Sequence, residues 1–277
     1  MIDSTIMYRP PAVAGKFYPD DPAKLRRQIA ELMDRVPQVQ MKGRVKGIIT
    51  PHAGYLYSGF TAAHAFAALR GEKFETVVVV SPSHFEFFPG VSVYPGEAYA
   101  TPLGMVEINK TLRNRIVGEA AFIISSETGH GTEHALEVQL PFLQEVLPPF
   151  TLLPIVIGNQ SREICFKVGE VLGKLLKDEN ALLVASTDLS HYYASDIATK
   201  FDMVMLDDVA DFDYEKLMTD LEERNTEACG GGPAVAVMSA LKHLGVKNIE
   251  VLHHSNSGDV TGDYSSVVGY LSAVAYA

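Results

Sequence analysis

Three apolar runs of this chain each end a few residues before a side chain that can do acid–base or metal chemistry. The runs are residues 47–50, 76–80 and 181–185, and the side chains that follow them are His52, His84 and the pair Asp188 and His191. Short apolar runs rich in valine, isoleucine and leucine are typical of buried strands. Open α/β sheets bind their ligands beyond the carboxyl ends of such strands. The pattern therefore predicts that these four side chains meet in one site.

His52 and His84 are candidate metal ligands. Imidazole is a common ligand of transition metals, and two histidines at equivalent positions favour a shared role. The alternative is that each histidine is a structural residue of its own turn.

Cys229 is a third candidate ligand. It directly precedes three glycines at residues 230–232, and Pro233 stands in the first turn of the predicted helix that follows. Backbone N–H groups and the positive end of a helix favour a thiolate, which binds metals and electrophiles. Two alternatives stay open: Cys229 can be a small residue packed in a tight turn, or Gly230 and Gly231 can bind a phosphate or carboxylate through their N–H groups.

Asp188 and His191 are three residues apart in a predicted turn. At that spacing the carboxylate can orient an imidazole that acts as a general base. The alternative is an aspartate that caps the following segment, beside a surface histidine.

A predicted helix at residues 133–147 carries a further histidine. Glu133 and Glu137 lie four residues apart on one face of this helix, and His134 is offset from them. The spacing is not HExxH, which excludes a zincin-type protease. These side chains can hydrogen-bond metal-bound histidines, or they can form a solvated helix face.

Other candidates carry weaker signals. Tyr55 and Tyr57 follow His52 closely and can line a substrate pocket. The remaining polar or aromatic candidates are His130, Tyr192, Tyr193, His253, His254, Asp259 and Asp263. His64 and His243 fall within predicted helices, and we expect no role for them.

Composition restricts the possible partners. The chain has 277 residues, of which 47% are hydrophobic and 21% charged, and its net charge is −11. Nucleic acids and anionic membranes attract positive surfaces, so neither is expected as a partner. No apolar run of about 18 residues predicts a membrane span, and residues 1–18 lack a signal-peptide pattern. The two cysteines, of which Cys165 is expected in the core, are too few for a disulfide framework, so we expect a cytoplasmic protein.

Strands and helices alternate along the chain. Further strands are expected at residues 121–124, 152–157, 249–253 and 265–274, with a β-excursion at 90–108 and a short linker at 37–43. Helices are expected at about 22–36, 61–69 with Ser58 as a cap, 109–117, 133–147, 161–177, 195–223 in two pieces, and 234–244. Such alternation predicts an α/β fold with a central, mainly parallel or mixed sheet flanked by helices. We expect a single domain over residues 1–277.

Seven motifs then resemble one protein family. They are PHAGYLYSG, SPSH, TPLG, EHALEVQLPFL, STDLSHY, ACGGGP and SSVVGY, and they lie between Pro51 and Tyr270. In this order they resemble the Memo family, whose prokaryotic members are often called AmmeMemoRadiSam system protein B.

The resemblance implies a fold similar to the class III extradiol ring-cleaving dioxygenases. It implies that His52, His84 and Cys229 hold a single metal ion, with iron or copper favoured over zinc. The positions of Asp188 and His191 match the catalytic base of those enzymes. His134 would line the same cleft, with Tyr57 in its wall. The family name further implies AMMECR-type and radical-SAM proteins as partners.

One ligand departs from the dioxygenase pattern. Non-heme iron oxygenases of this type use two histidines and a carboxylate, whereas the third ligand here would be the Cys229 thiolate. A thiolate is softer and shifts the preference toward Cu(I) or Zn(II).

Three functions are compatible with these residues. The first is metal-dependent redox chemistry on an unknown small molecule, with His191, Asp188 and His134 as catalytic residues, Asp188 orienting His191. The second is a hydrolase or transferase that uses zinc or the Cys229 thiolate. The third is non-catalytic binding of a phosphorylated or anionic peptide in the same cleft. The resemblance implies both possibilities, because the cleft of the eukaryotic family member has been associated with phosphotyrosine-peptide binding and with copper- or iron-dependent redox activity.

Overall fold

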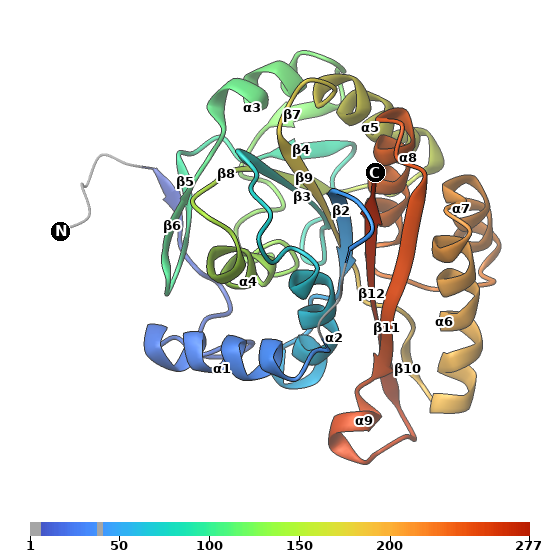
Figure 1. Cartoon of the computed structure of the whole chain (residues 1–277). Coiled ribbons are helices and arrows are strands. Elements are labelled where there is room, and N and C mark those ends of the chain that lie inside the picture. Colours follow the sequence, from blue (N-terminus) through green and yellow to red (C-terminus); the bar gives the residue numbers. More distant parts are fainter. Residues whose placement is uncertain (1–6, 38–40) are drawn as a thin grey trace.

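A mixed β-sheet forms the centre of the molecule, shown in Figure 1 as a computed structural model that describes residues 7–37 and 41–277. Its strands are β2 (Val45–Thr50), β3 (Thr76–Pro82), β4 (Val91–Val93), β7 (Ile123–Ser125), β8 (Thr151–Ile157), β9 (Ala181–Ser186), β10 (His191–Tyr193), β11 (Asn248–Asn256) and β12 (Val267–Tyr276). Their order across the sheet is β10-β12-β2-β9-β3-β8-β4-β7, and β11 pairs with β12. The four adjacent strands β2, β9, β3 and β8 are parallel. Antiparallel strands β12 and β4 flank them, which confirms the predicted mixed α/β sheet.

Part of the predicted β-excursion lies outside this sheet. Strands β5 (Ala98–Thr101) and β6 (Gly104–Glu107) pair as a hairpin, and β1 (Tyr8–Arg9) adds to β5 to give a small three-stranded sheet. The chain before the first helix is thereby anchored to the body of the protein.

Helices cover both faces of the central sheet (Figure 1). They are α1 (Pro22–Asp34), α2 (Tyr55–Ala67), α3 (Lys110–Val117), α4 (Gln139–Val146), α5 (Arg162–Leu175), α6 (Ser195–Ala210), α7 (Tyr214–Glu223) and α8 (Gly231–His243). The short helix α9 (Gly258–Thr261) lies between β11 and β12, at the end of that strand pair. A hydrophobic core lies on each face of the sheet, and alternate residues of β3 belong to one core or the other. Val77 and Val79 pack in a cluster with α1, α2 and α4, whereas Val78 and Val80 pack with α3, α5, α6, α7 and α8. A strand that is buried on both faces has a continuous apolar sequence, and the four consecutive valines of β3 fit this pattern.

Two predicted helix starts are wrong. Helix α2 begins at Tyr55 and not near Ser58, because the Gly54 carbonyl already accepts the N–H groups of Tyr57 (2.8 Å) and Ser58 (3.1 Å). Ser58 lies inside the first turn, where its hydroxyl donates to the Ala53 carbonyl at 2.9 Å.

The helix predicted from residue 133 begins only at Gln139. The Glu133 carboxylate accepts the N–H groups of His134 (2.8 Å) and Ala135 (2.9 Å), which holds this stretch in a turn. The linker predicted at residues 37–43 lies partly outside the described residues.

No helix within residues 7–37 and 41–277 is long and apolar enough to cross a membrane. The expectation of a cytoplasmic location stays a prediction.

Candidate metal centre

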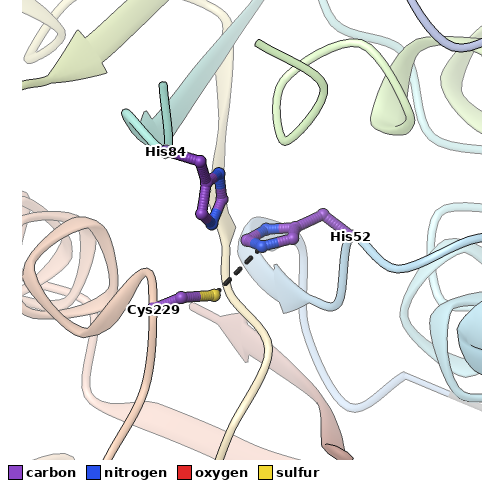
Figure 2. Close-up of side chains that lie close together, drawn as sticks. All are labelled: His52, His84 and Cys229. Atoms are coloured by element: carbon purple, nitrogen blue, oxygen red, sulfur yellow. Dashed lines mark hydrogen bonds between the residues drawn. The ribbon is translucent and has the colours of Figure 1, made fainter. Parts of the chain in front are cut away.

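The three predicted metal ligands converge at the carboxyl edge of the parallel strands. His52 follows β2, His84 follows β3, and Cys229 precedes α8. One donor atom from each lies within 4.8 Å of the donors of the other two. Figure 2 shows the three side chains pointing toward one another, and the His52 Nε2 atom lies 3.0 Å from the Cys229 sulfur. This spacing brings two imidazoles and a thiol around one point.

Hydrogen bonds to Ser186 fix the tautomer of His52. The Ser186 hydroxyl donates its proton to the Ala135 carbonyl at 2.6 Å and accepts from the Gln139 side-chain amide at 2.8 Å. Its 2.9 Å contact with His52 Nδ1 must therefore be one that it accepts. Nδ1 carries the proton, which leaves the lone pair of Nε2 free on the side that faces Cys229.

A carboxylate fixes His84 in the same way. His84 Nδ1 lies 2.9 Å from Glu133 Oε1, and the His84 backbone N–H donates to Oε2 at 2.5 Å. Burial raises the pKa of Glu133, but the hydrogen bonds from His84 and from backbone N–H groups outweigh it and hold this pKa at about 2. The ionised carboxylate accepts the Nδ1 proton, so Nε2 is the nitrogen that His84 offers to a metal. A carboxylate behind a histidine is a common arrangement in metal sites.

The turn that carries Cys229 is held from two neighbouring strand ends. Gln160, which follows β8, donates to the Cys229 carbonyl and accepts the Gly232 N–H, both at 2.8 Å. Thr187, which follows β9, accepts the Gly230 N–H at 3.0 Å. A Cβ atom on Gly230 would collide with the Ser186 carbonyl, so only glycine allows this close approach.

Burial decides the charge state of the cysteine in the metal-free protein. It raises the pKa of the Cys229 thiol, and the nearby Asp188 carboxylate raises it further, outweighing the N–H groups of Asp188 and Gly230. Burial and the neighbouring His84 lower the pKa of His52 to about 3. The expectation that the turn by itself favours a thiolate is therefore wrong. A neutral thiol faces a neutral imidazole, and a thiolate there needs a cation as its counter-charge.

Asp188 holds the loop around His52 and is not bonded to His191. Its Oδ1 atom accepts the backbone N–H of His52 at 2.7 Å and that of Ala53 at 3.3 Å. Among the described residues its carboxylate makes no hydrogen bond to His191, which corrects the predicted aspartate–histidine pair. Burial raises the pKa of Asp188 from its ordinary value.

A cavity of about 680 Å³ opens beside these groups. Its lining residues are Lys16, Phe17, His52, Ala53, Gly54, Tyr57, His84, His134, Asp188, His191, Tyr192, Ser257, Thr261, Asp263, Ser266, Val268 and Tyr270. The predicted site residues His134, His191 and Tyr57 are among them.

His134 forms an aromatic cluster with the two candidate ligands. Its ring stacks on His84 with centroids 4.9 Å apart and stands edge-on to His52 at 5.5 Å. Burial and the neighbouring His52 lower the pKa of His134 to about 4, so it is neutral at pH 7. Its neutral ring can accept a hydrogen bond or a proton in the cavity.

Three predicted pocket residues do not line the cavity. Tyr55 is 3% exposed and its hydroxyl donates to the Val138 carbonyl at 2.7 Å, so it belongs to the core. Gly230 and Gly231 lie behind the Cys229 turn, where a Cβ atom would meet Ser186 and Leu221 respectively.

Several residues of the site carried no clear signal in the sequence. Ser186, Gln139 and Gln160 hold the ligands through hydrogen bonds. Ser186 ends β9 and Gln160 lies three residues beyond β8, so a search for polar side chains at every strand end would have found both.

Of the weaker candidates, Tyr192 and Asp263 line the cavity. The others, His130, Tyr193, His253, His254 and Asp259, are not among its lining residues.

A second group supports the loop that carries Glu133 and His134. The buried Arg9 guanidinium pairs with the buried Glu137 carboxylate and also donates to the Glu133 carbonyl. Glu137 further accepts the N–H groups of Ala12 (2.7 Å) and Val13 (3.1 Å). Glu137 therefore has a structural role that ties the N-terminal segment to the site.

An α/β sheet that brings two histidines and a cysteine together at its carboxyl edge defines this class of protein by fold and candidate site. Comparison with known proteins then shows the family. The model of the Memo-like protein family matches residues 9–274, and the chain belongs to that family. The MEMO1 family protein MTH_45 of Methanothermobacter thermautotrophicus is 40% identical over 273 residues, covering 95% of this chain and 99% of that protein. The MEMO1 family protein TV1383 of Thermoplasma volcanium is 37% identical over 270 residues, covering 97% and 98%.

One solved structure supports the fold alone. The uncharacterized protein JW3007 from Escherichia coli K12 matches with a TM-score of 0.54 and 16% sequence identity. The match covers 82% of this chain and 99% of that one.

Proposed function

We propose that this protein is a metal-dependent oxidoreductase that binds one metal ion through His52, His84 and Cys229, and that it acts on a small organic molecule in the adjoining cavity. Iron or copper is the proposed metal. The observation that carries the proposal is the pair of fixed tautomers, because Ser186 and Glu133 leave both Nε2 atoms bare toward one point.

The remaining residues fit a cation at that point. The Cys229 thiol loses its proton more readily when a cation is its neighbour, because the cation offsets the cost of a buried negative charge. Three protein ligands leave coordination positions open toward substrate. His52, His84 and Cys229 would hold a redox-active metal, which would supply one-electron chemistry toward a bound substrate.

The cavity residues supply the rest of the proposed chemistry. His191 and His134 line the cavity and are the proposed catalytic residues that exchange protons with substrate. Tyr57 lines the same cavity and is 41% exposed, which suits it to contact with a bound molecule. Asp188 acts by holding the backbone of His52 in place.

A thiol-based hydrolase has one observation in its favour, the 3.0 Å contact between Cys229 and His52. The environment works against it. Burial raises the pKa of the thiol and lowers the pKa of the imidazole, so the charged nucleophile and its partner are both disfavoured without a metal. The metal-dependent function is therefore the one we propose. AMMECR-type and radical-SAM partners stay a prediction.

Metal content tests the proposal. The wild-type protein, purified without chelator or affinity metal, is expected to hold about one equivalent of iron or copper, measured by inductively coupled plasma mass spectrometry. Cys229→Ser and His52→Ala are each expected to lose most of this metal. His243→Ala, which removes an exposed histidine outside the site, is the matched control and should retain it.

Two results would contradict the proposal. One is stoichiometric metal in Cys229→Ser and His52→Ala alike, which would place the ion elsewhere. The other is a wild-type protein that binds neither metal after anaerobic reconstitution, which would favour the thiol-based or binding functions.

A further inference from the structure

The segment between β9 and α6 is held in a strained shape beside the cavity. Tyr192 has φ = 65°, the left-handed conformation that residues with a side chain rarely adopt. Its ring is 76% exposed and lines the cavity. Backbone strain of this kind persists only where surrounding contacts impose it. Tyr192 lies at a register shift between His191 and Tyr193, where β10 pairs with β12. The residues just before it, Leu189 and Ser190, are held by two further elements.

Asp202 of α6 supplies the contacts on one side of this segment. It is 1% exposed, and its Oδ1 atom accepts both the Ser190 N–H at 3.1 Å and the Ser190 hydroxyl at 2.7 Å. Its Oδ2 atom lies 3.1 Å from His254 Nε2 on β11. Both carboxylate oxygens are thus engaged, and Ser190 is held at its backbone and its side chain together.

Strand β12 supplies the contacts on the other side. The Leu189 N–H donates to the Gly269 carbonyl at 2.9 Å, and the Gly269 N–H donates to the Ser190 carbonyl at 3.0 Å. A Cβ atom on Gly269 would overlap the Asp202 carboxylate, so glycine at this position lets the strand and the aspartate reach Ser190 together. The segment is fixed between α6, which follows it directly, and β12, which is distant in sequence.

Ser190 lies between the two residues that this segment brings to the site. Asp188, two residues before it, accepts the His52 N–H through its carboxylate, and its own N–H lies 3.4 Å from the Cys229 sulfur. His191, the residue after Ser190, lines the cavity. A shift at Ser190 therefore reaches two of the three candidate ligands, His52 and Cys229, and a candidate catalytic residue, His191.

We propose that Asp202 is a positioning residue of the metal centre, which acts by clamping Ser190 and thereby setting the positions of Asp188 and His191. The proposal rests on the proposed metal-binding function. No part of it needs Asp202 to touch metal or substrate. Asp202 holds Ser190 through a carboxylate oxygen that accepts two hydrogen bonds. Asparagine keeps one such oxygen, so it should replace Asp202 better than alanine does.

Cobalt(II) binding tests the proposal with a spectroscopic signature. Co(II) bound by a cysteine shows a thiolate-to-metal charge-transfer band, whose intensity reports the Cys229 geometry. Relative to wild type, Asp202→Ala is expected to weaken Co(II) binding about tenfold and to reduce or shift this band, as loss of supporting hydrogen bonds does at metal sites. Asp202→Asn should restore most of the affinity and the band. Asp207→Asn, at an exposed position of the same helix, should match wild type.

Hydrogen exchange supplies a readout that needs no metal. The amides of Leu189 and Ser190 are expected to exchange at least about tenfold faster in Asp202→Ala than in wild type, while those of β2 and β9 keep their rates. Ser190→Ala removes only the hydroxyl bond and should give a smaller change in the same direction, which keeps the test usable if Asp202→Ala does not fold.

The possible failures are separable. Wild-type protein that binds neither Co(II) nor iron or copper would overturn the proposed function and the inference resting on it. If folded Asp202→Ala and Ser190→Ala keep the wild-type Co(II) affinity and spectrum, the role of Asp202 alone is overturned. Unchanged hydrogen exchange at residues 189 and 190 in these variants would overturn it as well.

Discussion

At the scale of single residues, the site depends on which nitrogen of each histidine carries a proton. Ser186 and Glu133 settle this, because each must accept the Nδ1 proton of the histidine it contacts. The free Nε2 atoms then lie on the side of Cys229. If Ser186 or Glu133 were removed, the histidine that it contacts would no longer be held with Nε2 free to bind a metal.

Glu133→Gln tests this dependence. The amide replaces an anionic acceptor by a neutral one, so His84 is no longer held in one tautomer and orientation. We expect metal affinity to fall by about 10- to 100-fold, measured by competition with a chromophoric chelator. Glu163→Gln, at an exposed position in the first turn of α5, is the matched control. An affinity equal to wild type in Glu133→Gln would show that this hydrogen bond has no part in ligand preparation.

That the three candidate ligands lie together was predictable from sequence, whereas the residues that support them were not. His52 and His84 stand just beyond apolar runs, and the family motifs add Cys229. Ser186 and Gln160 gave no signal because a single serine or glutamine at a strand end has many structural uses. Tyr55 was wrongly placed in the pocket together with Tyr57. Two residues apart on a helix are about 200° apart around its axis, so both cannot face one cavity.

At the scale of elements, the start of α8 fixes the thiol. Gly230 lets the helix approach β9 closely enough for Thr187 to accept its N–H and for Cys229 to reach His52. The turn and the strand end are therefore one packed unit.

Gly230→Ala should disrupt that unit. The added methyl group meets the backbone carbonyl of Ser186, which has no freedom to move aside. We expect a loss of about 3 kcal/mol in the free energy of unfolding, measured by urea denaturation, together with weaker metal binding. Gly131→Ala is the control, because no atom lies within 4 Å of the added carbon. Equal stability of the two variants would refute the close approach described for α8.

The Arg9–Glu137 pair fixes a second element, the turn before α4. Arg9→Met leaves the buried Glu137 carboxylate without its cation, and an uncompensated buried charge costs about 3–5 kcal/mol. Chemical denaturation should show a loss of this size. Lys167→Met, which breaks the exposed pair with Glu170, should leave the midpoint within error of wild type. A small effect of Arg9→Met would mean that the N-terminal segment does not stabilise this turn.

The same element shows a limit of sequence reasoning. Residues 133–147 have a helical pattern, yet Glu133 uses its carboxylate to bind backbone N–H groups and His84 at once. A carboxylate with these local partners favours a turn over a helix interior. The partner His84, which follows β3, is distant in sequence, so the pattern of the segment alone did not reveal it.

At the scale of the whole molecule, the order of four parallel strands brings the site together. Strands β2, β9, β3 and β8 are adjacent, and the residues beyond their ends are His52, Asp188, His84 and Gln160. The alternation of strands and helices predicted the fold class and the shared edge. The strand order was not predictable, because it depends on pairings between residues far apart in sequence.

The free energy of unfolding should also depend on pH through a buried carboxyl group outside the candidate site, that of Asp208. Burial raises the pKa of Asp208 on α6 to about 6, although Lys216 lowers it in part. The unfolded chain ionises this group near pH 4, so the folded state loses relative stability as pH rises from 4 to beyond 6. Asp208→Asn lacks this loss. Its free energy of unfolding should improve relative to wild type by roughly 1–2 kcal/mol between pH 4 and 7, a value reduced for solvent screening at Lys216. Denaturation curves of both proteins at several pH values test this. A difference in the free energy of unfolding between Asp208→Asn and wild type that stays constant with pH would contradict it.

The central claim is that one metal ion is bound by two imidazoles and one thiolate. X-ray absorption spectroscopy at the edge of the metal retained by the purified protein tests it most directly. The account predicts one sulfur scatterer at about 2.3 Å together with imidazole nitrogens at about 2.0–2.1 Å, and loss of the sulfur shell in Cys229→Ser. A first shell made only of nitrogen and oxygen in the wild-type protein would contradict the assignment of Cys229 as a ligand.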